Sequence, residues 1–158
     1  MRVLGLLALV LASPAAAQAP GGLAAAVAAF VAVTLEAPMP APPEIATATP
    51  ERLRALRHGH AAGRPAALDV VALYDDAART ILLPEGWTGE SPAEMSVLVH
   101  EMVHHAQNVA GRRFACPAER EAEAYAVQER WLALFGETLE GAFGIDPMTR
   151  LVLTRCGL

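Results

Sequence analysis

The sequence contains no lysine, only two cysteines, and few aromatic residues, 5% of a chain of 158 residues. All of its basic side chains are therefore arginines, and the formal net charge at pH 7 is -5. An acidic chain of this kind argues against a surface that binds nucleic acid or anionic membranes. With 54% hydrophobic residues and this length, the chain is expected to fold as one ordinary domain.

The N-terminal segment has the layout of a secretory signal peptide. A basic residue precedes an apolar run over residues 3–12, and an Ala-x-Ala pattern then permits cleavage before Gln18. We therefore expect residues 1–17 to be removed and residues 18–158 to form a single domain. Such a product would be periplasmic or secreted from a bacterial cell. The next apolar stretch is about half the roughly 20 residues that a membrane span requires, so no membrane attachment is expected after cleavage.

The two cysteines are Cys116 and Cys156. In an exported protein, an even number of cysteines without CxxC spacing favours one disulfide over a metal or redox site. The bridge would close a loop of about 40 residues, for which the chain-entropy estimate is about 4 kcal/mol. It would tie the C-terminus to the segment just before Glu119.

The spacing of apolar residues, prolines and capping residues predicts mostly helical structure. Helices are expected, in chain order, over residues 23–35, 50–57, 92–110, 117–136 and shortly after Asp146. Runs over residues 68–74 and 79–83, separated by a four-residue connection, predict an antiparallel hairpin. We therefore expect a compact α+β domain in which helices predominate, with the hairpin packed beside the helix over residues 92–110.

An HExxH pattern, His100 to His104, lies within that helix. Its two imidazoles project from one helix face and can hold one zinc ion, while Glu101 beside them can polarise a zinc-bound water. Both histidines lie about 150° from the centre of the helix's apolar stripe, which disfavours two ordinary core histidines. A pair of solvated surface histidines remains an alternative to a zinc site.

A catalytic zinc site requires a third protein ligand, and the helix over residues 117–136 offers several carboxylates. The apolar stripe of this helix is expected to comprise Ala124, Val127, Trp131, Leu134 and Phe135. Glu121 lies about 60° from the centre of the stripe, whereas Glu119, Glu123 and Glu129 are interpreted as solvated charges. A carboxylate turned inward requires a cation or hydrogen-bond donors, so Glu121 is the candidate third ligand.

Several neighbours allow two interpretations. Tyr125, one turn after Glu121, could orient that carboxylate or donate to a developing oxyanion, or it could be a core tyrosine. Gln107 could hydrogen-bond a ligand or substrate, or it could be solvated. His105 is expected to support the site from behind or to lie on the surface. His58 and His60 fit a polar loop better than a zinc site.

These motifs resemble the gluzincin-type zinc metallopeptidases, in which HExxH on one helix is completed by a Glu from a later helix. The motifs that carry the resemblance are LVHEMVHHAQ (98–107) and EREAEAY (119–125), with YDDAARTILLP upstream similar to the strand beside such sites. The chain is also similar to a small group of exported bacterial proteins with HExxHHxQ, a Cys and an ExxAY segment. Related gluzincins often carry ExxAD, where this chain has Tyr125.

The resemblance implies a zincin-like fold with His100, His104 and Glu121 as Zn²⁺ ligands and Glu101 as general base. The sequence thus predicts an exported zinc-dependent hydrolase that acts on a peptide or protein substrate, and the strand near residues 79–83 could pair with an extended peptide. One alternative is a non-catalytic zinc-binding module or pseudo-peptidase. Another is an exported structural domain that binds no metal and is held by its disulfide.

Overall fold

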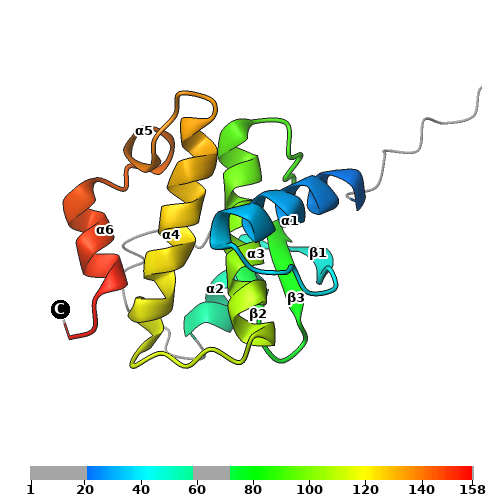
Figure 1. The fold of residues 1–158 in the computed structure, drawn as a ribbon, viewed down its shortest axis with the longest axis horizontal. Coiled ribbons are helices and arrows are strands. Elements are labelled where there is room, and N and C mark those ends of the chain that lie inside the picture. Colours follow the sequence, from blue (N-terminus) through cyan, green and yellow to red (C-terminus); the bar gives the residue numbers. More distant parts are fainter. Residues whose placement is uncertain (1–20, 59–71, 158) are drawn as a thin grey trace, which may run out of the picture.

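The structure is a computed structural model that describes residues 21–58 and 72–157. The expected signal peptide, the first part of the strand predicted over residues 68–74, and His60 lie outside the described residues. Within them the chain forms six helices and one three-stranded sheet, which confirms the compact α+β class (Figure 1). None of the described helices is long and apolar enough to cross a membrane.

The elements follow the predicted order, with two additions. The helices are α1 (Gly21–Leu35), α2 (Pro50–His58), α3 (Pro92–Val109), α4 (Pro117–Ala133), α5 (Leu139–Phe143) and α6 (Pro147–Thr154). The strands are β1 (Glu44–Ala48), β2 (Leu73–Asp75) and β3 (Thr80–Pro84). The sequence did not predict α5 or β1, because each is only five residues long and depends on tertiary packing to be stable.

The sheet has the order β1-β3-β2, with β1 parallel and β2 antiparallel to β3. The predicted hairpin is therefore confirmed, and the Asp75 carboxylate accepts hydrogen bonds from the amides of Ala77 and Ala78 in its turn, both at 3.0 Å. The expectation that a peptide could pair with β3 is wrong, because β3 is the central strand and both of its sides are taken. Among the described strands, β2 is an edge and faces the candidate site.

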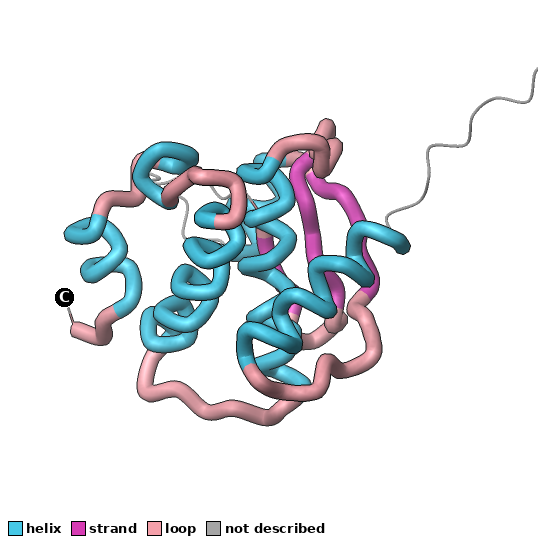
Figure 2. Tube along the Cα trace, turned by 45° about the horizontal axis from the view of Figure 1, so that its top comes forward, coloured by secondary structure: helices cyan, strands magenta, loops and turns pink. Residues whose placement is uncertain are grey.

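Helix α3 is the central element of the domain. It lies between α4 on one side and the sheet on the other, with α1 packed across it (Figures 1 and 2). A capping box fixes its start: the Ser91 hydroxyl accepts from the amide of Glu94, and the Glu94 carboxylate accepts from the amide of Ser91. Gly111, with φ +63°, follows its end in the left-handed conformation that terminates helices.

Both faces of α3 are buried, and this sets the chemistry of its polar side chains. Leu98, Val99, Met102 and Val103 fill the apolar core. The polar residues of the opposite face are also buried; they are Ser96, His100, Glu101, His104 and Gln107. Buried polar side chains require hydrogen-bond partners, so the partners of these residues indicate what the polar face of α3 is arranged to bind.

Helix α4 packs against that polar face. Ala124, Val127 and Trp131 are buried as predicted, but Leu134 and Phe135 are exposed, at 65% and 49%. The predicted stripe is wrong at these two positions because α4 ends at Ala133 instead of continuing to residue 136. Leu132 and Gln128 take part in the buried surface in their place, and α5 and α6 pack on the other side of α4.

The predicted disulfide joins Cys116, the N-cap residue of α4, to Cys156 after α6, with their Cα atoms 5.9 Å apart.

We expect reduction of this disulfide to lower the free energy of unfolding by about 4 kcal/mol, because the unfolded chain regains the entropy of a loop of about 40 residues. Denaturant unfolding with and without a phosphine reductant measures this difference. The Cys116→Ser/Cys156→Ser variant is the control, since its stability should not respond to reductant. Two alkylatable thiols in unreduced protein would contradict the prediction.

Candidate metal centre

Three side chains converge between α3 and α4. The two helices bring together His100, His104 and Glu121, whose potential ligand atoms all lie within 4.8 Å of one another, a grouping that can hold a metal ion. Glu121 Oε2 lies 3.0 Å from His100 Nε2 and 3.4 Å from His104 Nε2, and the two Nε2 atoms are 3.2 Å apart. The histidines are only 8% and 5% exposed, which excludes a solvated surface pair.

The hydrogen bonds behind His100 determine which of its ring nitrogens carries the proton. The Ser96 hydroxyl donates to the carbonyl oxygen of Ala93 at 2.7 Å, so it accepts from Nε2 of Gln128 at 3.1 Å. The amide oxygen of Gln128 therefore faces Nδ1 of His100, at 2.9 Å. Because that oxygen only accepts, Nδ1 carries a hydrogen and the lone pair of a neutral His100 lies on Nε2, toward Glu121.

A second glutamine fixes His104 in the same way. Nε2 of Gln107 donates to the carbonyl oxygen of Arg120 at 3.1 Å and to the carboxylate of Glu123 at 2.9 Å, so both amide hydrogens are used. Its oxygen lies 2.9 Å from Nδ1 of His104 and requires a hydrogen there. Nε of Arg120 also points toward this Nδ1, but its contact is longer, at 3.2 Å, and the Gln107 oxygen, which can only accept, decides the position of the hydrogen. The lone pair of a neutral His104 therefore lies on Nε2.

Two imidazole lone pairs and one carboxylate thus face the same point. The Glu121 side chain is only 17% exposed. Burial alone would raise the pKa of Glu121, but hydrogen bonds and positive charge from His100 and His104, when these rings carry a proton on Nε2, lower it far below its ordinary value. For His104, burial lowers the pKa, and the hydrogen bond to Glu121 together with the charges of Glu101 and Glu121 raises it overall. The arrangement favours a cation at this point, either a proton or a metal ion.

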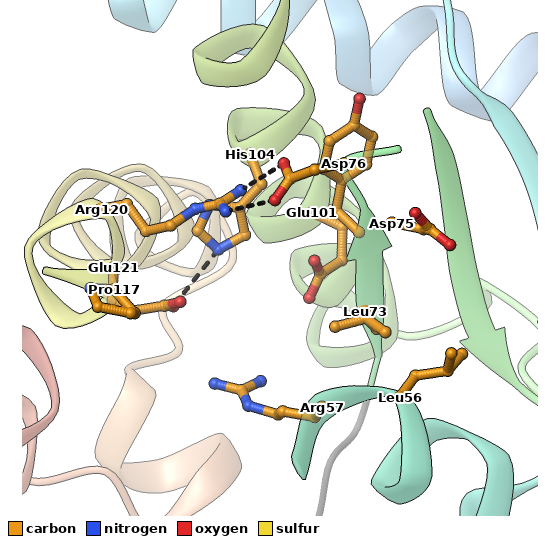
Figure 3. A pocket seen from close by; sticks show the side chains of 11 residues that line it. Leu56, Arg57, Leu73, Asp75, Asp76, Glu101, His104, Pro117, Arg120 and Glu121 are labelled. Atoms are coloured by element: carbon orange, nitrogen blue, oxygen red, sulfur yellow. Dashed lines mark hydrogen bonds and ion pairs between the residues drawn. The ribbon is translucent and has the colours of Figure 1, made fainter. Parts of the chain in front are cut away.

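The cluster opens into a cleft of about 520 Å³. Glu101, His104 and Glu121 line it together, and Figure 3 shows the Glu101 carboxylate pointing into the open space. Glu101 is 5% exposed and forms no hydrogen bond with another described side chain or backbone group, so its oxygens are available to a molecule in the cleft. Strand β2 contributes the other wall through Leu73 and Tyr74.

Tyr125 contacts the centre through its ring, not its hydroxyl. The ring lies edge-on to that of His100, with centroids 4.7 Å apart, and also packs against the cluster of Leu132, Leu139 and Ile145. Its hydroxyl forms no hydrogen bond with Glu121. Burial, together with the charge of Glu121, raises the pKa of Tyr125 to about 12, so its phenol stays protonated at neutral pH.

Other residues that the sequence analysis considered near the metal centre have structural roles or lie outside the described residues. His105 is buried, with Nε2 2.8 Å from the carbonyl oxygen of Ala41 and Nδ1 3.0 Å from the hydroxyl of Tyr74, so it anchors α3 to β2 and to the segment before β1. It is not a surface group. Glu123 is half-buried and accepts from Gln107 and Arg112, so its interpretation as a solvated charge is wrong. The side chain of His58 lies outside the described part of the chain.

Two other glutamates of α4 lie away from the cluster. Glu119 is exposed and accepts from the amide of Ala115. Glu129 accepts from the amide of Leu139 at 3.0 Å and so supports the start of α5. Neither belongs to the grouping of ligand atoms around His100.

The glutamine behind His100 permits a direct test of this geometry. We expect Gln128→Leu to weaken metal binding about 10- to 100-fold, because it removes the acceptor that fixes the proton on Nδ1. Gln128→Glu keeps an acceptor at the same place and should retain the affinity of the parent. A competition titration with a chromophoric chelator measures both. Equal affinities of the leucine variant and the parent would contradict the assigned role.

One family comparison bears on the chain. A family model described as "Domain of unknown function (DUF6647)" matches residues 19–143, which include the three converging side chains, Glu101 and both glutamines. The matched range ends before α6 and Cys156, so the disulfide lies partly outside it. No curated protein and no solved structure matches the chain.

Proposed function

The chain belongs to the DUF6647 family, and we propose that it is a zinc-dependent hydrolase, most simply a peptidase, that acts in the periplasm or outside the cell. The observation that carries this proposal is the convergence of two fixed imidazole lone pairs and a buried carboxylate beside Glu101, whose carboxylate points into the same cleft. The signal-peptide pattern and the disulfide support export.

The donor set and its spacing fit zinc and disfavour calcium and magnesium. Tetrahedral zinc with ligand bonds of about 2.0–2.1 Å places neighbouring ligand atoms about 3.3 Å apart. The three separations in this centre are 3.0, 3.2 and 3.4 Å. Two imidazoles and one carboxylate also match the ligand types of catalytic zinc sites with an open fourth position, whereas calcium and magnesium prefer oxygen ligands alone. His100, His104 and Glu121 would hold the ion.

Glu101 has the position required of a general base. A zinc ion in this centre would act as a Lewis acid and lower the pKa of a bound water toward neutrality. The Glu101 carboxylate lines the same cleft as His104 and Glu121 and makes no hydrogen bond to another described residue, so it can take a proton from a water there. It can then pass that proton to the leaving amine of a cleaved peptide bond. Gln107 and Gln128 keep both imidazoles oriented throughout.

An extended peptide fits the geometry of the cleft. Strand β2 is an edge of the described sheet and lines the cleft through Leu73, Tyr74 and Asp75. An edge strand presents free backbone groups that can pair with an extended chain. A peptide added along β2 would pass Glu101 and His104 on α3 and Glu121 on α4. We propose in addition that the fold is zincin-like.

Metal analysis and a digest test the proposal together. We expect mature protein to contain about one zinc per chain and to cleave members of a peptide library, with activity lost in a chelator and restored by zinc. Bound zinc without cleavage would indicate the non-catalytic module and would refute the hydrolase. Protein that takes up no zinc would refute both and leave a structural domain.

A further inference from the structure

The cleft contains a positively charged side chain that the proposed hydrolysis does not use. Arg57, in the last turn of α2, lines the cleft opposite the ligand cluster. Figure 3 shows its guanidinium extending toward the space between Glu101 and Glu121.

Arg57 differs from the other arginine in this cleft. The guanidinium of Arg120 forms two hydrogen bonds with the carboxylate of Asp76, at 2.8 and 3.2 Å, so its charge is compensated. Among the described residues, no carboxylate pairs with Arg57, which is exposed at the mouth of the cleft. In a chain of formal net charge -5, Arg57 is therefore well suited to attract an anionic group of a ligand.

Apolar side chains lie beside this cation. Leu56 precedes it on α2 and is 39% exposed, and Leu73 faces it from the start of β2; both line the cleft. Figure 3 shows the two leucines on the side of Arg57 away from Glu121. A ligand bound here would contact both the planar guanidinium of Arg57, with its paired N–H donors, and an apolar surface. This combination suits a carboxylate attached to an apolar residue.

We propose that Arg57, Leu56 and Leu73 form a subsite for the free C-terminal carboxylate of a short peptide whose last residue is apolar. The inference rests on the proposed hydrolase, because it adds a substrate class to that site. Arg57 and Glu101 line one small cleft, so a peptide held by its carboxylate at Arg57 would present a bond near its C-terminus to Glu101. The protein would then remove short C-terminal pieces from peptides or cleave very short peptides.

Binding measurements test the subsite without requiring turnover. The zinc-loaded Glu101→Gln variant is titrated calorimetrically with the tripeptide Ala-Ala-Leu and with its C-terminal amide. We expect the free acid to bind about tenfold more tightly than the amide, as a charge-assisted hydrogen-bond pair provides. Adding Arg57→Gln should remove this preference, and Arg57→Lys should restore part of it. Arg52→Gln is the matched control, because Arg52 lies on α2 outside the cleft lining and loses the same charge.

The outcomes separate the two proposals. A preference for the acid that persists in Arg57→Gln would place the carboxylate elsewhere, for example on the metal, and would overturn the subsite. An equally strong preference for Ala-Ala-Glu amide over Ala-Ala-Gln amide would overturn the assignment to the chain terminus. If the Arg57-dependent preference is present but the parent cleaves no peptide, the subsite stands and the hydrolase proposal fails.

Discussion

Replacing Glu121 by glutamine should release the metal at chelator concentrations that leave the parent protein loaded. The variant keeps the size of the side chain but removes the charged oxygen that lies 3.0 Å from His100 and 3.4 Å from His104. One of three protein ligands is lost, so we expect the affinity to fall by more than the roughly 10- to 100-fold typical of a lost outer partner. Competition titration against a chromophoric chelator gives the ratio.

Two neighbours on the same helix provide matched controls. Glu119→Gln removes the same charge from an exposed position and should remain fully loaded. Glu123→Gln should also remain loaded, because an amide oxygen at that position can still accept from Gln107, which holds His104. If Glu123→Gln lost the metal while Glu121→Gln kept it, the assigned third ligand would be wrong.

Replacing Glu101 by glutamine should leave the metal bound but abolish most turnover, in contrast to the loss of metal expected for Glu121→Gln. Glu101 is not part of the ligand cluster, so the metal affinity should stay within a few-fold of the parent. General base catalysis contributes about 10²- to 10⁴-fold, and kcat should fall by that factor because an amide cannot take the proton. Initial rates on a peptide found by the library digest, together with metal content per chain, separate these two effects.

A second variant guards against a purely structural explanation. Glu101 is buried beside the cluster, so its replacement could disturb packing, and thermal unfolding of zinc-loaded protein monitors this. Glu101→Asp keeps a base but withdraws it by one methylene, and it should retain more activity than Glu101→Gln. Activity of Glu101→Gln equal to that of the parent would refute the proposed mechanism.

Elements with local signals could be predicted from the sequence alone. Ser91, Pro92 and Glu94 are sufficient to start α3, because a capping box is satisfied within one turn. Helical periodicity placed His100 and His104 on one face, and it selected Glu121 over the other glutamates of α4. The disulfide followed from the number of cysteines and the export signal. The helix inferences depend only on the spacing of residues within one helix, which can be read directly from the sequence.

The contacts between distant residues arise from the packing of the elements and could not be predicted from the sequence. Gln128 lies two turns after Glu121 on α4, but its role behind His100 depends on the packing of α4 against α3. Asp76 and Arg120 are 44 residues apart and meet because the hairpin turn folds over the start of α4. Strand β1 pairs with β3, which turned the predicted edge into a central strand and left β2 beside the cleft. Such long-range contacts have no periodic signature in the sequence, because their energy comes from burial and hydrogen bonds between elements that only the folded chain brings together.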